Sequence, residues 1–158
     1  MIRFEVIDAT FNLRHKNAIK NWIKEIILSK NRRVGDINYV FADDSYVLDV
    51  NRTYLSHDYY TDIITFDTSD YEGITSAGAV SADIVISLDT VLANSRTYGS
   101  SFSRELYRVM IHGILHLTGN DDLTPEEAEL MRQAEDEALS LLPQFQISDD
   151  QIYTTVEK

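Results

Sequence analysis

One segment, from His112 to Asp122, constrains the fold of this chain more than any other. It reads His-Gly-Ile-Leu-His-Leu-Thr-Gly-Asn-Asp-Asp and closes a stretch whose apolar residues recur at helical spacing, which predicts a helix over residues 101–118. Histidines four residues apart on a helix project from one face, one turn apart. Gly119 can adopt the left-handed backbone conformation that ends a helix, so the chain would turn back toward the two imidazoles.

This turn would bring together the side chains of His112, His116 and Asp122, which predicts a site for one zinc ion or another divalent metal. Zinc in catalytic sites is commonly held by three such ligands, and water takes the fourth position. The sequence contains no cysteine and only four histidines, so histidine and carboxylate must supply the ligands of any transition metal. Asp121 is the competing carboxylate, and histidine pairs of this spacing also occur in helices that bind no metal.

The remaining pattern predicts an α+β fold with a small mixed sheet, because strands dominate the first half and helices the second. Strands are expected over residues 2–7, 36–42, 61–67 and 82–88, helices over residues 15–30, 46–54, 89–98, 101–118 and 124–142, and a loop over residues 71–79. The expected organisation is a single metal-dependent hydrolase domain over residues 1–143, followed by a polar tail over residues 144–158.

Composition limits the location and the partners of the protein. With 44% hydrophobic and 25% charged residues, the 158-residue chain has the composition of an ordinary globular protein. It shows neither a signal peptide nor an apolar run long enough to cross a bilayer, so we expect a cytoplasmic protein with no membrane partner. The net charge of −12 argues against general nucleic-acid binding, although seven of the fourteen basic residues lie within residues 14–33. These could form a basic face for a nucleic acid or simply a solvated helix surface.

The spacing His-x3-His-x2-Gly-x2-Asp is also that of the metzincin-type zinc proteases. In those enzymes a glutamate beside the first histidine is the general base that activates the zinc-bound water. Here that position is Gly113, which has no side chain and suggests either close helix packing or room for a substrate. A metalloprotease-like zinc hydrolase is therefore the second interpretation.

The same segment resembles the signature His-Gly-x-Leu-His-Leu-x-Gly-Tyr-Asp-His of the YbeY family of rRNA maturation factors. Two further stretches are similar to blocks of that family. Residues 50–66 resemble Leu-Asn-x-x-Tyr-Arg-x-x-Asp-x-Pro-Thr-Asp-Val-Leu-Ser-Phe, and residues 82–87 resemble Gly-Asp-Ile-x-Ile-Ser. The resemblance covers about residues 35–140, and the metal signature is its specific part.

This resemblance implies a metal-dependent, single-strand-specific endoribonuclease of the bacterial cytoplasm. Its implied roles are maturation of the small-subunit rRNA 3′ end and ribosome quality control, with single-stranded ribosomal RNA and the ribosome or ribosomal proteins as partners. It also implies a mixed sheet of about four strands with the metal-binding helix packed centrally. The alternative outside enzymes is a non-catalytic ribosome-assembly factor with a structural zinc, which would need a fourth protein ligand such as Asp121 or His57.

Several positions depart from the family pattern. The third ligand of the family is histidine, whereas this chain has Asp122, a carboxylate that adds negative charge and should acidify a bound water less. The family arginine is Leu55 here, so Arg52 and His57 become the candidates for substrate binding in its place. Two smaller departures, which look like packing changes, are Tyr60 in place of proline and Ala82 in place of glycine.

The sequence assigns no catalytic residue. Asp62, Asp83 and His57 are each possible general bases, and either a metal-bound water or the neighbouring 2′-hydroxyl of RNA could be the nucleophile. Three tyrosines could stack on unpaired bases, although buried aromatics are the commoner use of this residue. These tyrosines are Tyr54, Tyr59 and Tyr60.

Overall fold

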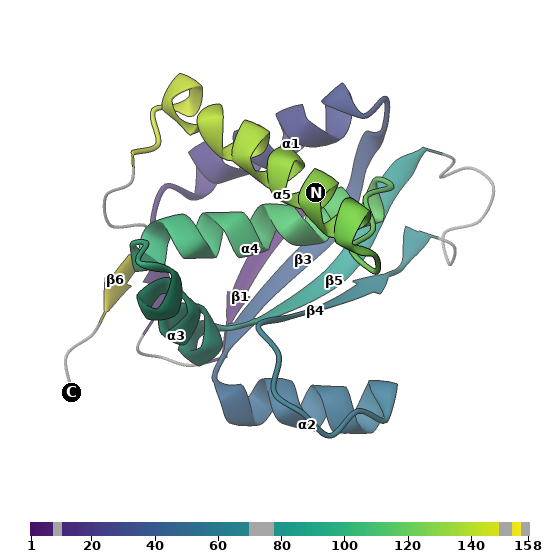
Figure 1. Cartoon of the computed structure of the whole chain (residues 1–158). Coiled ribbons are helices and arrows are strands. Elements are labelled where there is room, and N and C mark those ends of the chain that lie inside the picture. Colours follow the sequence, from purple (N-terminus) through teal and green to yellow (C-terminus); the bar gives the residue numbers. More distant parts are fainter. Residues whose placement is uncertain (8–10, 70–77, 149–152, 156–158) are drawn as a thin grey trace.

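The structure is a computed structural model that describes residues 1–7, 11–69, 78–148 and 153–155. Its main sheet has four strands in the order β1-β3-β5-β4, and two short strands, β2 and β6, pair separately (Figure 1). The strands are β1 (Ile2–Val6), β2 (Phe11–Leu13), β3 (Arg33–Ala42), β4 (Ile63–Asp67), β5 (Ala79–Ser87) and β6 (Tyr153–Thr155). Strands β1, β3 and β5 are parallel, whereas β4 runs antiparallel to β5, so the sheet is mixed.

In the described part of the chain, five α-helices and the 3-10 turn η3 complete the fold. They are α1 (Lys16–Ser29), α2 (Asp44–Leu55), α3 (Leu88–Tyr98), α4 (Phe102–Leu117), α5 (Pro125–Ser140) and η3 (Leu142–Phe145). Local sequence signals set several helix starts: the side chains of Asp43, Ser87, Ser101 and Thr124 each accept a hydrogen bond from a backbone N–H in the first turn. The prediction of an α+β fold with a small mixed sheet of four strands and five helices is confirmed.

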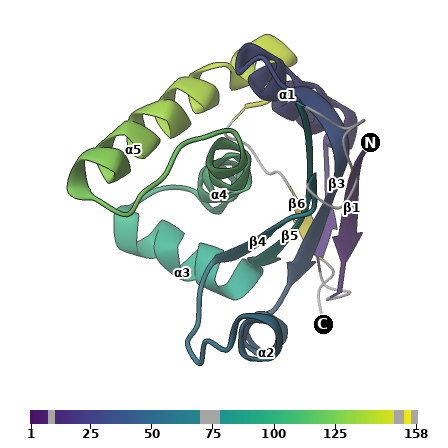
Figure 2. The same ribbon diagram turned by 90° about the vertical axis from the view of Figure 1, so that its right-hand side faces the viewer.

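Helix α4 lies at the centre of the molecule, between the sheet on one side and α5 and α3 on the other (Figure 2). Ten of its sixteen residues are buried. The hydroxyl of Tyr39 in β3 donates a hydrogen bond of 3.0 Å to the carbonyl of Met110, and burial raises the pKa of that phenol far above its usual value. A second link joins α1 to α5, because Trp22 Nε1 donates to the carbonyl of Ala138 at 2.8 Å. The first bond fixes α4 against the sheet, and the second fixes α5 against α1.

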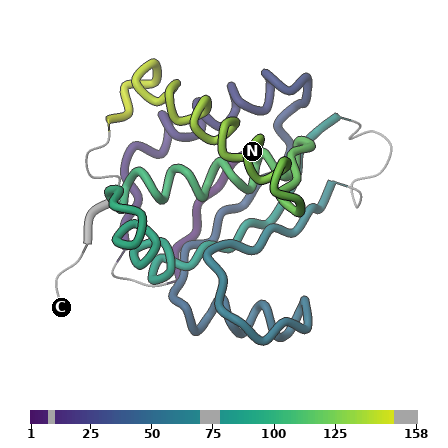
Figure 3. The backbone as a smooth tube through the Cα atoms, viewed as in Figure 1, coloured from purple at the N-terminus to yellow at the C-terminus, as the bar shows by residue number. Residues whose placement is uncertain are grey.

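The two faces of the sheet carry cores of different size. Strand residues alternate between faces, so Ile84 and Ile86 of β5 join the large core under α4, whereas Val85 joins a small core with Val40 and Val47 under α2. Figure 3 follows the chain from α4 through the turn into α5, which crosses over α4 on the large-core side. The end of α4 and the start of α5 therefore lie next to each other, joined by the turn between them.

Several boundaries differ from the expected ones. Strand β3 begins at Arg33, three residues before the expected start, and β5 begins at Ala79, which the sequence had suggested as the end of a loop. Residues 71–77, most of that expected loop, lie outside the described residues. Helix α5 ends at Ser140 because η3 begins directly afterwards around Pro143, and the expected tail contributes β6, which pairs antiparallel with β2. No helix in the part of the chain that the structure describes is both long and apolar enough to cross a membrane.

Candidate metal and substrate site

The turn that ends α4 has the hydrogen-bond pattern of a Schellman motif. The N–H of Asn120 donates to the carbonyl of Leu115 at 2.9 Å, and the N–H of Gly119 points to the carbonyl of His116 at 3.4 Å. Gly119 has φ +116°, in the region that side chains rarely tolerate. The predicted reversal at this glycine is therefore present, and it directs residues 120–122 back along the helix end.

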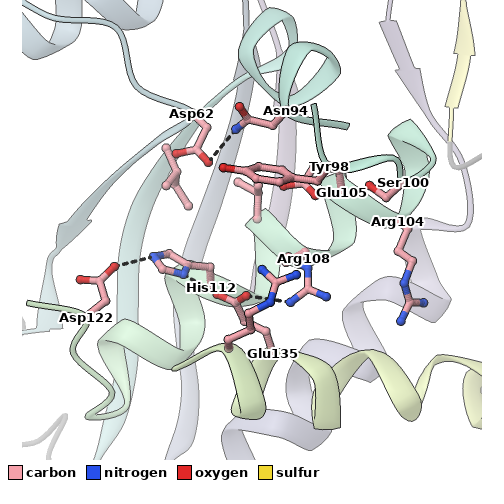
Figure 4. Close-up of a pocket in the computed structure, with 13 residues that line it drawn as sticks. Asp62, Asn94, Tyr98, Ser100, Arg104, Glu105, Arg108, His112, Asp122 and Glu135 are labelled. Atoms are coloured by element: carbon pink, nitrogen blue, oxygen red, sulfur yellow. Dashed lines mark hydrogen bonds and ion pairs between the residues drawn. The ribbon is translucent and has the colours of Figure 1, made fainter. Parts of the chain in front are cut away.

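His112 is held by a carboxylate from another helix. Its Nδ1 atom lies 2.6 Å from Oε2 of Glu135 in α5, and Oε1 of the same carboxylate accepts a hydrogen bond of 2.9 Å from Arg108 (Figure 4). Arg108 also donates to Asp136 at 2.7 Å. The Glu135 side chain is only 8% exposed, so this pair of bonds satisfies a buried carboxylate. The arrangement orients the ring of His112 and leaves Nε2 to face the turn.

Sequence reasoning missed Glu135, although a signal was present. Glu135 lies in a run of acidic residues, most of them exposed on α5, yet it shares the buried side of that helix with Met131, Ala138 and Leu139. A carboxylate on the apolar stripe of a helix needs a partner in the core. That requirement identifies Glu135 among its acidic neighbours.

The charge state of His112 follows from the same contacts. Burial alone would lower its pKa, but the hydrogen bond to Glu135 and the nearby carboxylates of Asp122 and Asp62 outweigh burial and raise the pKa above its usual value. These contacts therefore favour a positive charge at this position. A bound cation would take the place of that positive charge.

His116 is anchored by the turn itself. Its Nδ1 lies 2.7 Å from the backbone carbonyl of Asn120, and Asp121 Oδ1 lies 3.8 Å from the same ring nitrogen. Asp121 is therefore beside the Nδ1 edge of the ring, away from Nε2. Asp121, the alternative third ligand, thus lies on the side of the His116 ring that the backbone turn already contacts.

The remaining candidate ligand, Asp122, faces His112. Its Oδ2 lies 3.6 Å from Nε2 of His112, and two ligands of one tetrahedral zinc at usual bond lengths are separated by about 3.3 Å. The rings of His112 and His116 have centroids 5.8 Å apart. Ligating histidines usually donate their second ring N–H to a carboxylate or a carbonyl, as both histidines do here.

The donor types and their outer contacts thus fit a divalent transition metal. As the side chains stand, however, no three histidine, aspartate or glutamate residues within the described ranges form a group that could hold a metal ion. The ligand set His112, His116 and Asp122 stays a prediction, and closing it requires a small inward movement.

The surroundings of Gly113 decide between the two roles suggested for it, close helix packing and room for a substrate. A β-carbon at this position would lie 3.1 Å from Ile63 Cδ1 and 3.3 Å from Thr65 Oγ1, both on β4. The missing side chain therefore allows close approach of α4 to the sheet. It does not open space for a substrate beside the histidines.

Two cavities meet at the histidines. The first, of about 360 Å³, runs along α4 and is lined by polar and charged side chains that include Arg104, Arg108 and Glu105 (Figure 4). The second lies beside the end of α2 and includes Leu55, His57 and Tyr59. Four residues line both cavities, which makes them one groove: Asp62, Ile63, His112 and Asp122.

The structure separates the three possible general bases. Asp62, just before β4, lines both cavities, and its carboxylate lies 3.5 Å from Asn94 Nδ2. Burial raises its pKa, and the neighbouring His112 only partly offsets that rise. Asp83 is exposed and lines a different hollow together with Arg3. His57 lines the second cavity.

The suggested substrate residues have different positions. His57 stacks on Tyr59 with ring centroids 5.2 Å apart and 21° between their planes, and the Tyr59 hydroxyl lies 3.0 Å from His57 Nδ1. The buried amide of Asn51 donates to the Tyr59 carbonyl at 2.9 Å and fixes this loop. Arg52 is ion-paired with Asp58 at 2.5 Å and is not among the residues that line the groove. Neither Tyr54 nor Tyr60 is in that lining, although both are exposed.

Comparison with known proteins covers the whole site. The sequence profile of the family described as endoribonuclease YbeY matches residues 4–143. The endoribonuclease YbeY of Parabacteroides distasonis is 46% identical over 129 residues, 82% of this chain and 87% of that protein. Its counterpart from Phocaeicola vulgatus is 49% identical over 127 residues, 80% of this chain and 88% of that protein. A Thermotoga maritima protein determined in solution shares the fold, with a TM-score of 0.58 and 23% identity over 95% of this chain and 98% of that one.

Proposed function

Because this chain belongs to the endoribonuclease YbeY family, we propose that it is a metal-dependent endoribonuclease that cleaves single-stranded ribosomal RNA in the groove at His112. The observation that carries this proposal is the arrangement of that histidine. Its Nδ1 is fixed by Glu135, and its Nε2 faces Asp122 at 3.6 Å.

The proposed ligands of the metal are His112, His116 and Asp122, and zinc is the proposed ion. When bound, such an ion would polarise a phosphodiester oxygen and stabilise the charge that develops on it. The chain's own contribution is to hold both imidazoles by their Nδ1 atoms, so that neither ring has to reorient during the reaction.

We assign proton transfer to Asp62. It lies in the part of the groove shared by both cavities, and burial raises its pKa, so it holds a proton more readily than a free carboxylate does. The proton would come from the attacking oxygen, either water or the neighbouring 2′-hydroxyl. Asp83, on the other side of the sheet, has no such access.

The preference for single strands is assigned to the stacked pair of His57 and Tyr59. Tyr59 is 54% exposed, and both rings line the cavity that also contains His116. A base can stack on such a platform only when it is unpaired, and stacking on protein aromatics is the usual way in which single-stranded RNA is held.

The cellular role follows from the family. We propose that the protein acts in the cytoplasm on the 3′ end of the small-subunit rRNA, and in ribosome quality control, with the ribosome or ribosomal proteins as partners. Two observations argue against parts of the rival interpretations. The residue at the position of the protease base, Gly113, packs against β4, and Asp121 does not approach Nε2 of His116.

Elemental analysis of purified protein tests the ligand set. Wild type should contain about one zinc per chain, whereas His116→Ala and Asp122→Asn should lose it, and Asp121→Asn is the matched control that should retain it. Cleavage of a single-stranded ribosomal RNA fragment by the same four samples should follow their metal content. Stoichiometric zinc in His116→Ala would overturn the ligand assignment. If metal-loaded wild type cleaves peptides and leaves RNA intact, the proposed ribonuclease activity is wrong.

A further inference from the structure

The histidines continue a row of arginines along α4. Arg104, Arg108, His112 and His116 follow one another at intervals of four residues, so they lie along one side of the helix, about 6 Å apart in rise. Both arginines line the cavity that runs from His112 toward the start of α4. The row places positive side chains on the side of His112 opposite to His57 and Tyr59.

A third arginine comes from the neighbouring helix. Arg132 of α5 lines the same cavity, as do Ser100 and Asn94, which offer neutral hydrogen-bonding groups. Figure 4 shows Arg104 and Ser100 at the end of the cavity far from Asp122, with Arg108 between them and His112. We call Arg104, Arg108 and Arg132 together the arginine arm.

Acidic side chains also line this cavity, and Arg108 is itself ion-paired with Glu135 and Asp136. Glu135 accepts from both Arg108 and His112, so its charge is matched within the structure. Asp62 lies toward the other end of the cavity (Figure 4). Glu105 is buried, and burial raises its pKa, which disfavours its charged form beside an anion.

We propose that the arginine arm binds a backbone phosphate of the RNA strand that passes His112, an inference that rests on the proposed ribonuclease function. Guanidinium groups present a planar fork of donors that matches phosphate oxygens, and their charge is retained at every relevant pH. The two ends of the groove then have separate tasks: the arm holds the sugar-phosphate backbone, and the His57–Tyr59 platform holds a base. A strand would be bound in one direction across the histidines.

The double variant Arg104→Gln/Arg132→Gln tests the arm. Arg108 is left in place because its removal would deprive buried Glu135 of a partner beside His112. The control is Arg96→Gln, an exposed arginine of α3 that is outside the cavity lining and loses one positive charge where the double variant loses two. Thermal melts of all samples establish that they fold alike.

Cleavage and binding are then measured with a single-stranded octaribonucleotide, using its 2′-O-methyl phosphorothioate form, which resists attack by water as well as by the 2′-hydroxyl, as the binding probe. The double variant should raise KM and leave kcat near the wild-type value, because the phosphate contact is equal in the ground state and the transition state. The slope of log affinity against log salt should fall in magnitude by about 0.7 for one lost phosphate contact on a single strand. Arg96→Gln should change neither quantity. A dinucleotide too short to reach the arm should bind wild type and the double variant equally.

An unchanged KM and salt slope in the double variant, with RNA cleavage intact, would overturn the arm and leave the ribonuclease function standing. A fall in kcat at constant KM would overturn it as well. Wild type that cleaves no RNA at all would instead overturn the function on which the arm rests.

Discussion

The two histidines of the site are chemically the same and are held in different ways. His112 depends on Glu135, a residue of another helix and 23 positions later in the chain, whereas His116 depends on the carbonyl of Asn120, four positions later. The first contact exists only when α5 packs on α4. The second exists as soon as the helix ends in its Schellman turn.

One histidine of the site is thus held by a contact between helices, and the other by a contact within a single turn. A change in α5 should disturb His112 and spare His116, and a change in the turn should do the reverse. The difference also separates side-chain from backbone dependence, because Glu135 acts through its carboxylate and Asn120 through its main chain. Three substitutions test these distinctions.

Removing the carboxylate behind His112 should have the largest effect. Glu135→Ala should weaken zinc binding about 10- to 100-fold, as is usual when the outer partner of a ligating histidine is lost. Glu135→Gln, which keeps a hydrogen-bond acceptor without the charge, should fall between this variant and wild type. Competition with a chelating dye measures the affinity, and the exposed Glu137→Ala is the control. Equal zinc affinities in Glu135→Ala and Glu137→Ala would show that Glu135 does not position His112 for metal binding.

A strained turn should have the next largest effect. Gly119→Ala places a β-carbon at φ +116°, where it meets no neighbouring atom, so the cost is backbone strain of about 1–2 kcal/mol. Gly99→Ala is matched to it, since Gly99 also ends a helix with positive φ and has equally open surroundings. Both variants should lower the free energy of unfolding in urea, and Gly99→Ala should do so by the smaller amount, because its φ of +69° lies in the left-handed region that alanine can adopt. Only Gly119→Ala should also weaken zinc binding, and equal zinc affinities in the two would contradict a role of the turn in the site.

The side chain of Asn120 should matter least. His116 contacts its backbone carbonyl, so Asn120→Ala keeps the contact and should leave zinc affinity and RNA cleavage within a factor of about two of wild type. Isothermal titration with zinc and a cleavage assay measure both. A tenfold loss in either would show that the amide itself takes part.

The sequence predicted the parts of the molecule that are decided locally. The turn at Gly119 and the expected helices over residues 46–54, 89–98 and 124–142 each depend on residues within a few positions of one another. The order of the motifs along the chain was enough to identify the family. The three expected ligands come from one such local segment, which is why they could be named before the structure.

What the sequence did not show depends on contacts between distant segments. Strands β2 and β6 have three residues each and pair across almost the whole chain, so neither has a readable pattern alone. Glu135 resembled its acidic neighbours until the packing of α5 was known. The preference for Asp62 over Asp83 required knowing which residues open into the groove, because Asp62 directly precedes β4, Asp83 lies within β5, and both strands are of similar composition.

The enclosure of α4 has a consequence for how a cation enters and leaves. Backbone amides such as that of Met110 should exchange with deuterium only when the whole domain opens, since the helix is covered by the sheet and by α5. Asp122 lies on an exposed stretch and can move without such an opening. Asp122 would then be the mobile ligand beside two fixed imidazoles, and the lifetime of the bound ion would depend on how often its carboxylate moves away.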